Sequence, residues 1–331
     1  MAARSTARTR IGVGVLLVLA FGLAVLAGAA VLLGVARISA SPPVFVLSGL
    51  LGFLLVLAAG VWFATRRLAG SRRRVRVLGL VGGVALALVL FVPTTFVSTP
   101  AVAPDPVRGQ RFWDLPTGSR LAYVEVPGRG ERRSTPVVFV HGGPGTPDME
   151  GDRDYVGRLA ESGFDVYVYD ALGSGRSTRL ARPQDYSIER DIADLEAIRE
   201  AIGAERLNLI GHSYGANVVA GYLATHPANV ERVVFSSPGS LDPRDASGAL
   251  ATSRLDSDRR ARLYAALLSP RNLLAYGLLQ VNPDAAHAFA TDGEMDTRLD
   301  EIYAISEPGL HCRGGLPADE LPRGLGFYRL Q

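Results

Sequence analysis

A serine in this sequence stands where a strand is expected to turn into a helix. Residues 211–215 read Gly-His-Ser-Tyr-Gly, after a short apolar run and before the small-residue stretch 216–224. In this context the pattern predicts a nucleophile elbow, because the flanking Gly211 and Gly215 let the backbone turn sharply and raise the hydroxyl above a sheet. A chain with 37 glycines can also place such a pattern in a loop by chance. The context favours the elbow, and we expect Ser213 to be a nucleophile.

A second glycine-rich turn directly follows the apolar run 137–140. Residues 141–145 read His-Gly-Gly-Pro-Gly, and backbone N–H groups in such a turn can approach a bound group closely. An elbow of this kind takes one oxyanion donor from this loop and one from the residue after the nucleophile, so we predict the N–H groups of Gly143 and Tyr214. A simple Gly-Pro turn is the alternative interpretation. The residues expected to shape the loop are His141, Gly142, Pro144 and Gly145.

Together with residues 170–177, these two motifs give residues 112–238 a likeness to a known family. They resemble the proline iminopeptidase-like branch of the α/β-hydrolases. The resemblance implies an α/β-hydrolase core, a Ser-Asp-His triad and acyl-enzyme chemistry on the N-terminal residue of peptides. In that family, the motif that corresponds to residues 170–177 reads Asp-Gln-Arg-Gly-x-Gly-x-Ser. Here Ala171 and Leu172 replace its Gln and Arg.

The acid and the base that would activate the serine are not identifiable in the sequence. A neutral serine hydroxyl is a poor nucleophile and needs both. The histidines after the elbow each have a structural interpretation: His226 precedes Pro227 at a helix end, His287 lies in a short helix, and no strand leads into His311. We therefore expect the chain to stop inside or just after its cap, with the triad acid and base unknown.

Two classes of function remain open. The first is a membrane-anchored serine hydrolase, an aminopeptidase or an esterase, that takes a small peptide or ester substrate at Ser213. The second is a catalytically incomplete fragment of the fold with at most a binding role. Labelling of Ser213 by a fluorophosphonate would distinguish the two.

Other chemistry has little support in the sequence. The family binds a substrate amino terminus with acidic side chains in its cap, but a solvated helix face explains the acidic residues here equally well. Those residues are Asp292, Glu294, Asp296, Asp300 and Glu301. The single cysteine, Cys312, allows no intramolecular disulfide and lies in a loop without an elbow. No metal-ligand cluster, phosphate loop or dinucleotide fingerprint stands out, so we expect neither metal nor cofactor.

The elements around these motifs alternate between strand and helix. Strands are expected at residues 121–126, 137–140, 164–169, 207–210 and 230–235, and helices at 154–162, 188–202 and 216–224. This order predicts an α/β core with a mostly parallel sheet, covered on both faces. Helices are expected after it at 250–268, 270–280, 283–290 and 292–305. We assign residues 107–239 to the hydrolase core and 240–331 to a helical cap that is incomplete.

The first hundred residues hold most of the apolar excess of a chain that is 48% hydrophobic. Residues 11–36, 44–64 and 77–97 are apolar stretches near the ~20 residues of a membrane-crossing helix. A cleaved signal peptide is the alternative for the first stretch, although its apolar run is too long. We predict a membrane domain over residues 1–97, with its helices in the lipid bilayer, and a linker over residues 98–106.

Arginine placement predicts the orientation of these spans. Arg4, Arg8 and Arg10 precede the first span, and six arginines lie between the second and third spans. Positively charged loops stay in the cytoplasm, so the N-terminus is expected inside and the hydrolase domain outside the cell membrane. No charged residue lies within the spans, which favours anchoring over transport. The net charge of +3 and this arginine distribution speak against a nucleic-acid partner.

Overall fold

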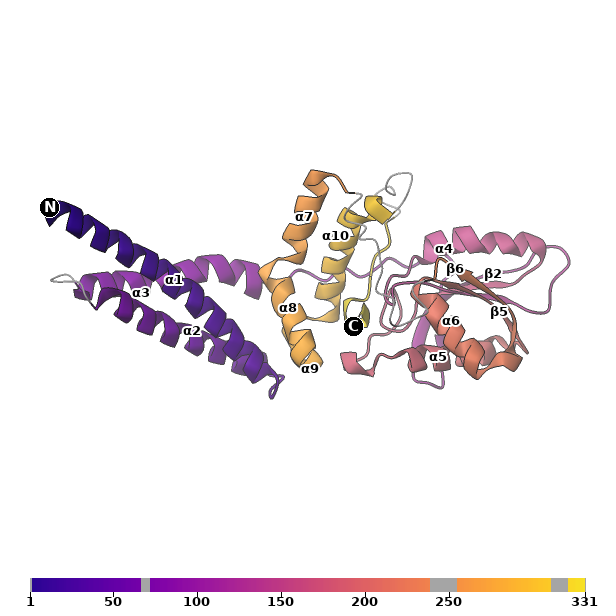
Figure 1. Cartoon of the computed structure of the whole chain (residues 1–331). Coiled ribbons are helices and arrows are strands. Elements are labelled where there is room, and N and C mark those ends of the chain that lie inside the picture. Colours follow the sequence, from indigo (N-terminus) through magenta and orange to yellow (C-terminus); the bar gives the residue numbers. More distant parts are fainter. Residues whose placement is uncertain (1, 67–71, 239–254, 311–320, 331) are drawn as a thin grey trace. The chain divides into compact units, whose positions relative to one another are not determined.

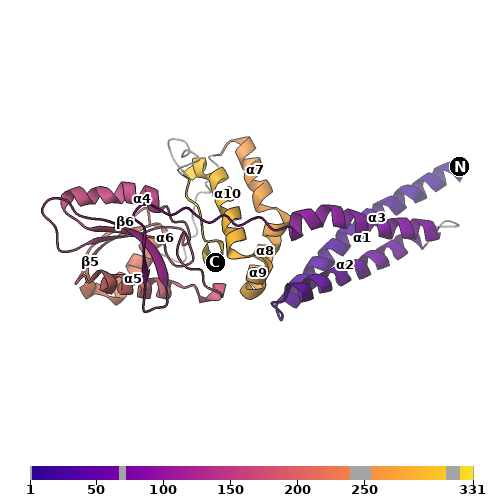
Figure 2. The same cartoon turned by 180° about the vertical axis from the view of Figure 1, so that it is seen from behind.

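The computed structural model describes residues 2–66, 72–238, 255–310 and 321–330. The chain forms two compact units, which Figure 1 and Figure 2 show from opposite sides. The first unit consists of residues Met1–Ser98 and Leu267–Ala290. The second consists of Thr99–Ala266 and Thr291–Gln331.

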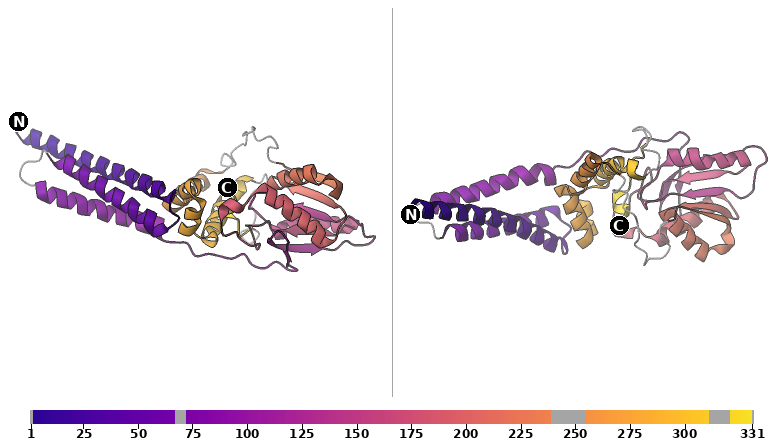
Figure 3. Two further views of the ribbon diagram at one scale, coloured as in Figure 1. Left: turned by 90° about the horizontal axis from the view of Figure 1, so that it is seen from below. Right: turned by 45° about the horizontal axis from the view of Figure 1, so that its top comes forward.

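The first unit contains three long apolar helices that lie side by side (Figure 3). They are α1 (Ala2–Ala36), α2 (Pro42–Thr65) and α3 (Arg72–Phe91), and a π-helical turn, η1 (Val92–Phe96), continues α3. Each is long and apolar enough to cross a membrane, with mean hydropathies of 2.8, 2.6 and 2.5 over the apolar spans. The three predicted spans are therefore present as helices, although the third begins at Arg72 rather than at residue 77.

Two further helices belong to the first unit. They are α8 (Pro270–Val281) and α9 (Pro283–Phe289), which lie close to their predicted positions. The Asn282 side chain between them donates a hydrogen bond to the carbonyl of Ala36 at the end of α1 (2.8 Å). The Phe289 ring lies 6.5 Å from the rings of both Phe45 and Phe96. The α8–α9 pair thus contacts the adjacent ends of α1, α2 and η1.

The second unit is built on a six-stranded sheet in the order β1-β2-β4-β3-β5-β6. The strands are β1 (Arg111–Asp114), β2 (Arg120–Val126), β3 (Val137–Val140), β4 (Val166–Tyr169), β5 (Leu207–His212) and β6 (Val230–Ser236). β2 pairs antiparallel with β1 and β4, and the other pairs are parallel. The prediction of a mostly parallel sheet is confirmed, whereas β1 was not predicted.

Helices cover both faces of this sheet (Figure 2). On one face lie α4 (Met149–Val156) and the 3-10 turn η2 (Gly157–Ser162), and on the other α5 (Ile188–Ile202) and α6 (Tyr214–Thr225). The prediction of a helix at residues 154–162 is wrong in two respects. The helix starts earlier, at Met149, and residues 157–162 form a 3-10 turn. Asp148 caps α4 by accepting a hydrogen bond from the N–H of Gly151, so the helix begins at Met149.

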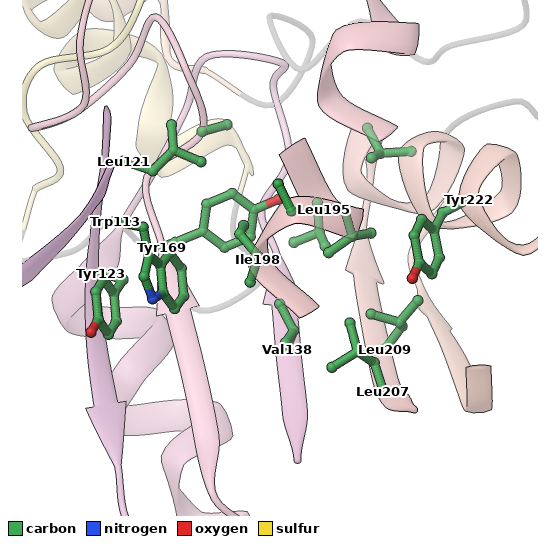
Figure 4. Close-up of a cluster of buried hydrophobic side chains, with 14 of the residues drawn as sticks. Trp113, Leu121, Tyr123, Val138, Tyr169, Leu195, Ile198, Leu207, Leu209 and Tyr222 are labelled. Carbon is green, nitrogen blue, oxygen red and sulfur yellow. The ribbon is translucent and has the colours of Figure 1, made fainter. Parts of the chain in front are cut away.

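Alternation along the strands sends side chains to two separate cores. Val138 and Val140 of β3 belong to a core cluster that also contains residues of α5 and α6, among them Leu195 and Tyr222. Figure 4 shows part of this cluster. Their neighbours Val137 and Phe139 pack instead on the α4 side, with Met149 and Val156. This period of two explains why β3 is apolar at every position, as strands covered on both faces are.

The other elements of the second unit, within its described residues, are turns and helices. Two 3-10 turns, η3 (Pro183–Asp185) and η4 (Pro227–Asn229), precede α5 and β6. The helices α7 (Ser257–Leu267) and α10 (Asp292–Leu310) follow β6, and η6 (Phe327–Leu330) is the last described turn. α7 begins later than residue 250, and residues 250–254 lie outside the described part. α10 extends five residues past its predicted end at residue 305.

Candidate active site

Ser213 occupies the turn between β5 and α6 in a strained conformation. Its φ is 50° and its ψ −117°, a left-handed region that side chains with a Cβ rarely adopt. The turn is held from both sides, because the Ser213 N–H donates to the carbonyl of Ser236 (3.1 Å) and the Ser213 carbonyl accepts from the N–H of Ala216 (3.0 Å). The Ser213 hydroxyl makes no hydrogen bond to any residue that the structure describes.

Gly211 and Gly215 leave the space in which this turn forms. A methyl group built on Gly215 would lie 2.1 Å from the carbonyl oxygen of Val140, the last residue of β3. One built on Gly211 would lie 2.6 Å from the carbonyl oxygen of Gly215. The first turn of α6 is thereby pressed against the end of β3, which brings the loop after β3 next to Ser213.

That loop, residues 141–145, meets the serine closely. A methyl group on Gly142 would lie 3.0 Å from Cβ of Ser213, and Gly143 has a φ of 116°. Neither the N–H of Gly143 nor that of Tyr214 has an acceptor among the residues the structure describes. The two N–H groups predicted to bind an oxyanion thus have no acceptor in the described part of the chain, and the loop that carries Gly143 lies against the serine.

The His141 ring ties this loop to its neighbour. Its Nδ1 lies 2.7 Å from the carbonyl oxygen of Gly142, and its Nε2 accepts a hydrogen bond from the Ala171 N–H (2.9 Å). Burial lowers the pKa of His141 to about 4. The ring is therefore neutral at physiological pH, with its proton on Nδ1 and both nitrogens engaged.

The loop that carries Ala171 is itself held by buried polar groups. Oδ2 of Asp170 accepts from the N–H of Arg176 (2.8 Å), and the Ser177 hydroxyl bridges the Asp170 carbonyl (2.6 Å) and the N–H of Ala122 (2.9 Å). Burial raises the pKa of Asp170 to about 6, and its Oδ1 has no partner among the described residues. Leu172 is buried in the apolar core, where the related motif has a polar arginine.

A buried ion pair anchors Tyr214 from the side of α5. The Tyr214 hydroxyl donates to Oδ2 of Asp191 (3.0 Å), and the Arg329 guanidinium pairs with the same oxygen. Arg329 and Asp191 are only 3% and 5% exposed. Burial raises the pKa of the Tyr214 hydroxyl, and the Asp191 charge adds to the rise.

The segment that carries Arg329 also contacts the other half of the site. The Gly326 N–H donates to the carbonyl of Gly145 (2.7 Å), and the Gly175 N–H donates to that of Gly324 (2.7 Å). We call residues 324–329 the C-terminal strap. Sequence reasoning missed it, because Gly-Leu-Gly-Phe-Tyr-Arg has no helical or strand period.

The acidic residues of α10 hold the strap in place. Asp300 accepts the N–H groups of Gly324 (2.8 Å) and Leu325 (2.9 Å), and Asp296 accepts that of Phe327 (2.9 Å). Asp296 also pairs with Arg179 (2.8 Å), and Glu294 with Arg298 (3.2 Å). Burial raises the pKa values of Asp296 and Asp300 to about 6. The solvated-face interpretation is therefore wrong for the buried Glu294 and Asp296, although it fits the exposed Glu301.

No base lies on the serine in the described part of the chain. His226 follows the far end of α6, where its ring stacks on Tyr222 at 4.8 Å. His287 belongs to α9 in the first unit. His311 and Cys312 lie outside the described residues. The described residues also contain no cluster of three or more side chains suited to a metal ion.

Comparisons with known proteins agree with this architecture. Residues 135–274 match the family model described as the alpha/beta hydrolase fold. A proline iminopeptidase of Heyndrickxia coagulans is 34% identical over 123 residues, 37% of this chain and 41% of that protein. A (lyso)-N-acylphosphatidylethanolamine lipase of Mus musculus is 29% identical over 227 residues, 63% of this chain and 61% of that protein.

A solved α/β hydrolase from Novosphingobium aromaticivorans is 28% identical over 38% of this chain and 42% of its own, with a TM-score of 0.34. The chain spans between 41% and 61% of the length of the two curated relatives above. The second unit thus has an α/β-hydrolase core with partial homology to proline iminopeptidases and to these lipases.

Proposed function

We propose that this chain is a serine hydrolase that works through an acyl-enzyme on Ser213, with the N-terminal residue of peptides as its first substrate class. The observation that carries the proposal is the backbone of Ser213, which is strained and lies against the loop of Gly142. Strain of about 1 to 3 kcal/mol persists only where the surroundings impose it, and such residues cluster at active sites. The partial homology to proline iminopeptidases supports the peptide substrate.

The proposed reaction follows from the groups around the serine. The Ser213 hydroxyl attacks the substrate carbonyl carbon, and the negative charge that develops on the carbonyl oxygen is bound by the N–H groups of Gly143 and Tyr214. Each such donor contributes ~3 kcal/mol of transition-state stabilisation. The C–N or C–O bond then breaks, the amine or alcohol leaves, and water hydrolyses the acyl-serine. Removal of the serine proton requires a base, which the described residues do not supply.

An ester substrate is the second candidate. The lipase match covers 63% of this chain, whereas the proline iminopeptidase match covers 37%. The three apolar helices would hold an esterase at a bilayer, where lipid esters are concentrated. A peptidase needs a carboxylate that binds the substrate ammonium, whereas an esterase needs an apolar pocket.

A binding role without catalysis is the candidate from another class. It is favoured by the Ser213 hydroxyl, which has no hydrogen-bond partner among the described residues. Without a base the serine is a weak nucleophile, whatever the geometry of the oxyanion donors.

A fluorophosphonate probe on the full-length protein in detergent tests these candidates. We expect Ser213 to be labelled, the Ser213→Ala variant not to be, and the wild type to cleave aminoacyl amides faster than simple esters. Faster cleavage of esters would assign the esterase. Absence of both labelling and turnover above the Ser213→Ala control would reject the enzyme and leave the binding role.

We further propose that the three helices anchor the chain in the cell membrane, with the N-terminus cytoplasmic and the second unit outside. The arginines before α1 and between α2 and α3 support this orientation. Single cysteines test it in a Cys312→Ser background: a membrane-impermeant maleimide should label Ser257→Cys on intact cells and Ser5→Cys only after permeabilisation. Labelling of Ser5→Cys alone on intact cells would reverse the proposed topology.

A further inference from the structure

An apolar cavity of about 530 Å³ lies within the first unit, between α1, α2, α3, η1 and α8. Its volume falls in the range of small-molecule binding sites, ~300–1,000 Å³. Residues that line it include Gly28, Leu32, Phe53, Ala87, Thr95 and Leu274. Thr95 is the one lining residue with a polar side chain.

The cavity is elongated along the third span. Its lining extends along this span from Val84 to Phe96, the end of the apolar stretch. The 12 residues from Val84 to Thr95 span about 16 Å of helix. That length is about half of the ~30 Å hydrocarbon core of a bilayer, which is the depth of one lipid leaflet.

The Thr95 hydroxyl is unpaired at the end of this cavity. Thr95 is 6% exposed, and its Oγ1 has no hydrogen-bond partner among the described residues. Two other threonines of the same unit have hydrogen-bonded hydroxyls. The Thr65 hydroxyl donates to the Val61 carbonyl (2.7 Å), and the Thr94 hydroxyl donates to the Leu90 carbonyl. An unpaired buried hydroxyl costs about 1 to 3 kcal/mol, which a ligand oxygen in the cavity would recover.

Arg271, which lies outside the cavity lining, holds the backbone at this end. The buried guanidinium of Arg271 donates to the carbonyls of Thr95 (2.8 Å) and Phe289 (3.2 Å) and lies 4.5 Å from the Phe289 ring centroid. The first of these contacts fixes the position of the Thr95 backbone carbonyl. The cavity therefore combines an apolar slot with a single hydroxyl at one end.

We propose that this cavity binds a single long acyl chain, with an oxygen of its head group hydrogen-bonded to the Thr95 hydroxyl. The chain would lie along α3 between Gly28 and Phe53, and the head group would lie at the level of η1. A free fatty acid and one chain of a membrane phospholipid share this chemistry. The site is separate from the proposed hydrolase function, because every lining residue belongs to the first unit.

Photo-crosslinking on the full-length protein tests the proposal. Protein in vesicles receives either a diazirine-bearing palmitic acid or a phospholipid with the same diazirine chain, and labelled peptides are mapped by mass spectrometry. We expect one of the two probes to label α1, α2 or α8 at lining residues such as Leu32 and Leu274. The probe that does so identifies the source of the chain.

Matched variants give the sharpest comparison. Ala87→Phe fills the cavity, whereas Ala85→Phe adds the same ring on the exposed side of the same helix. We expect Ala87→Phe to reduce labelling of the lining at least tenfold and Ala85→Phe to leave it unchanged. Thr95→Val keeps the side-chain shape, removes the hydroxyl, and should weaken binding about fivefold to tenfold, in line with one lost hydrogen bond. Ser213→Ala should have no effect.

Two outcomes would overturn the proposal. One is labelling spread evenly over outward-facing residues such as Leu19 and over the lining. The other is lining labelling that neither Ala87→Phe nor Thr95→Val changes in protein with wild-type thermal stability.

Discussion

At the scale of single residues, the sharp turn at Ser213 could be predicted from the sequence. Its strained backbone is held in place by the packing around it. The prediction of a sharp turn rested on Gly211 and Gly215, and the structure shows why both are glycine. Neither position has room for a Cβ, since backbone oxygens lie 2.1 to 2.6 Å from where it would stand. The serine between them carries a Cβ in a region of φ that disfavours one.

This strain predicts an unusual order of stabilities at position 213. We expect Ser213→Gly to be more stable than Ser213→Ala by about 1 kcal/mol, because only glycine adopts this φ without cost. The free energy of unfolding can be followed by the fluorescence of Trp113, in a Trp62→Phe background that leaves one tryptophan.

Ser257, the exposed first residue of α7, supplies the control for that comparison. There the order should reverse, with Ala at least as stable as Gly, because glycine is unfavourable in helices. Equal stability of Gly and Ala at position 213 would contradict the strained geometry.

The half-buried carboxyl of Asp152, in the first turn of α4, predicts a pH dependence. Burial, together with the nearby charge of Asp148, raises its pKa from 3.8 to about 8. Between those pH values the folded state keeps a proton that the unfolded state has lost, so stability falls as pH rises. Asparagine imitates the protonated form, and the stability advantage of Asp152→Asn over wild type should grow from pH 4 to pH 8 and then level off. Thermal unfolding at pH 5 and at pH 8.5 measures it.

The neighbouring Asp154 is a matched control for this titration. Its side chain is 71% exposed and, among the described residues, pairs with Arg153 on the surface. Asp154→Asn should leave the pH profile unchanged, because exposed ion pairs contribute little. An Asp152→Asn advantage that is the same at pH 5 and pH 8.5 would show that this carboxyl is ionised throughout.

At the scale of elements, the site depends on how α6 packs against β3. The two come within van der Waals contact through the backbone of Gly215, so the loop after β3 and the elbow share one support. The order of strands and helices that places them was readable from the sequence, since β3 and β5 are apolar runs and α5 has a clear helical period.

Two glycines of α6 offer a direct test of this packing. A methyl group at Gly215 meets the backbone of Val140, which cannot move alone, and we expect Gly215→Ala to lose about 3 kcal/mol of stability. At Gly221 it meets only the tip of the Ile192 side chain. Gly221→Ala should stay within about 1 kcal/mol of wild type, because better helix propensity offsets the shift of Ile192. Urea unfolding followed by Trp113 fluorescence compares them.

The elements that sequence reasoning missed have a common cause. β1 is four residues long and its ends are Arg111 and Asp114, so its pairing with β2 is needed to define it. The strap of residues 324–329 has no period of its own, and its conformation comes from the carboxylates of Asp296 and Asp300. The start of α4 could have been predicted from the sequence, since Asp148 precedes Gly151 at the spacing of a helix cap.

At the scale of the whole molecule, each unit has a core of its own. Ala24, Phe53, Leu57 and Val61 form one in the first unit, and the sheet residues form two in the second. Sequence order suggested a cap that runs on from the core, but residues Leu267–Ala290 belong to the compact unit of the apolar helices. The position of an apolar helix in the sequence does not determine which of the two units it packs against.

Separate cores predict separate unfolding transitions. Trp62 lies on α2 and Trp113 in the core of the sheet, so each tryptophan reports one unit. We expect Gly215→Ala to lower the transition reported by Trp113 and to leave that of Trp62 unchanged, with single-tryptophan variants used for each signal. Coincident shifts of both signals would mean that the two units unfold as one.

The first unit is built from two separate stretches of the sequence, which has a consequence for biosynthesis. Its last two helices are translated only after the whole α/β sheet, although they contact the ends of α1, α2 and η1. The ribosome must therefore release about 170 further residues after η1 before Arg271 can reach the carbonyl of Thr95. During that interval the three apolar helices lack their final partners, so a nascent chain stalled before residue 267 should be more open to protease than the finished protein.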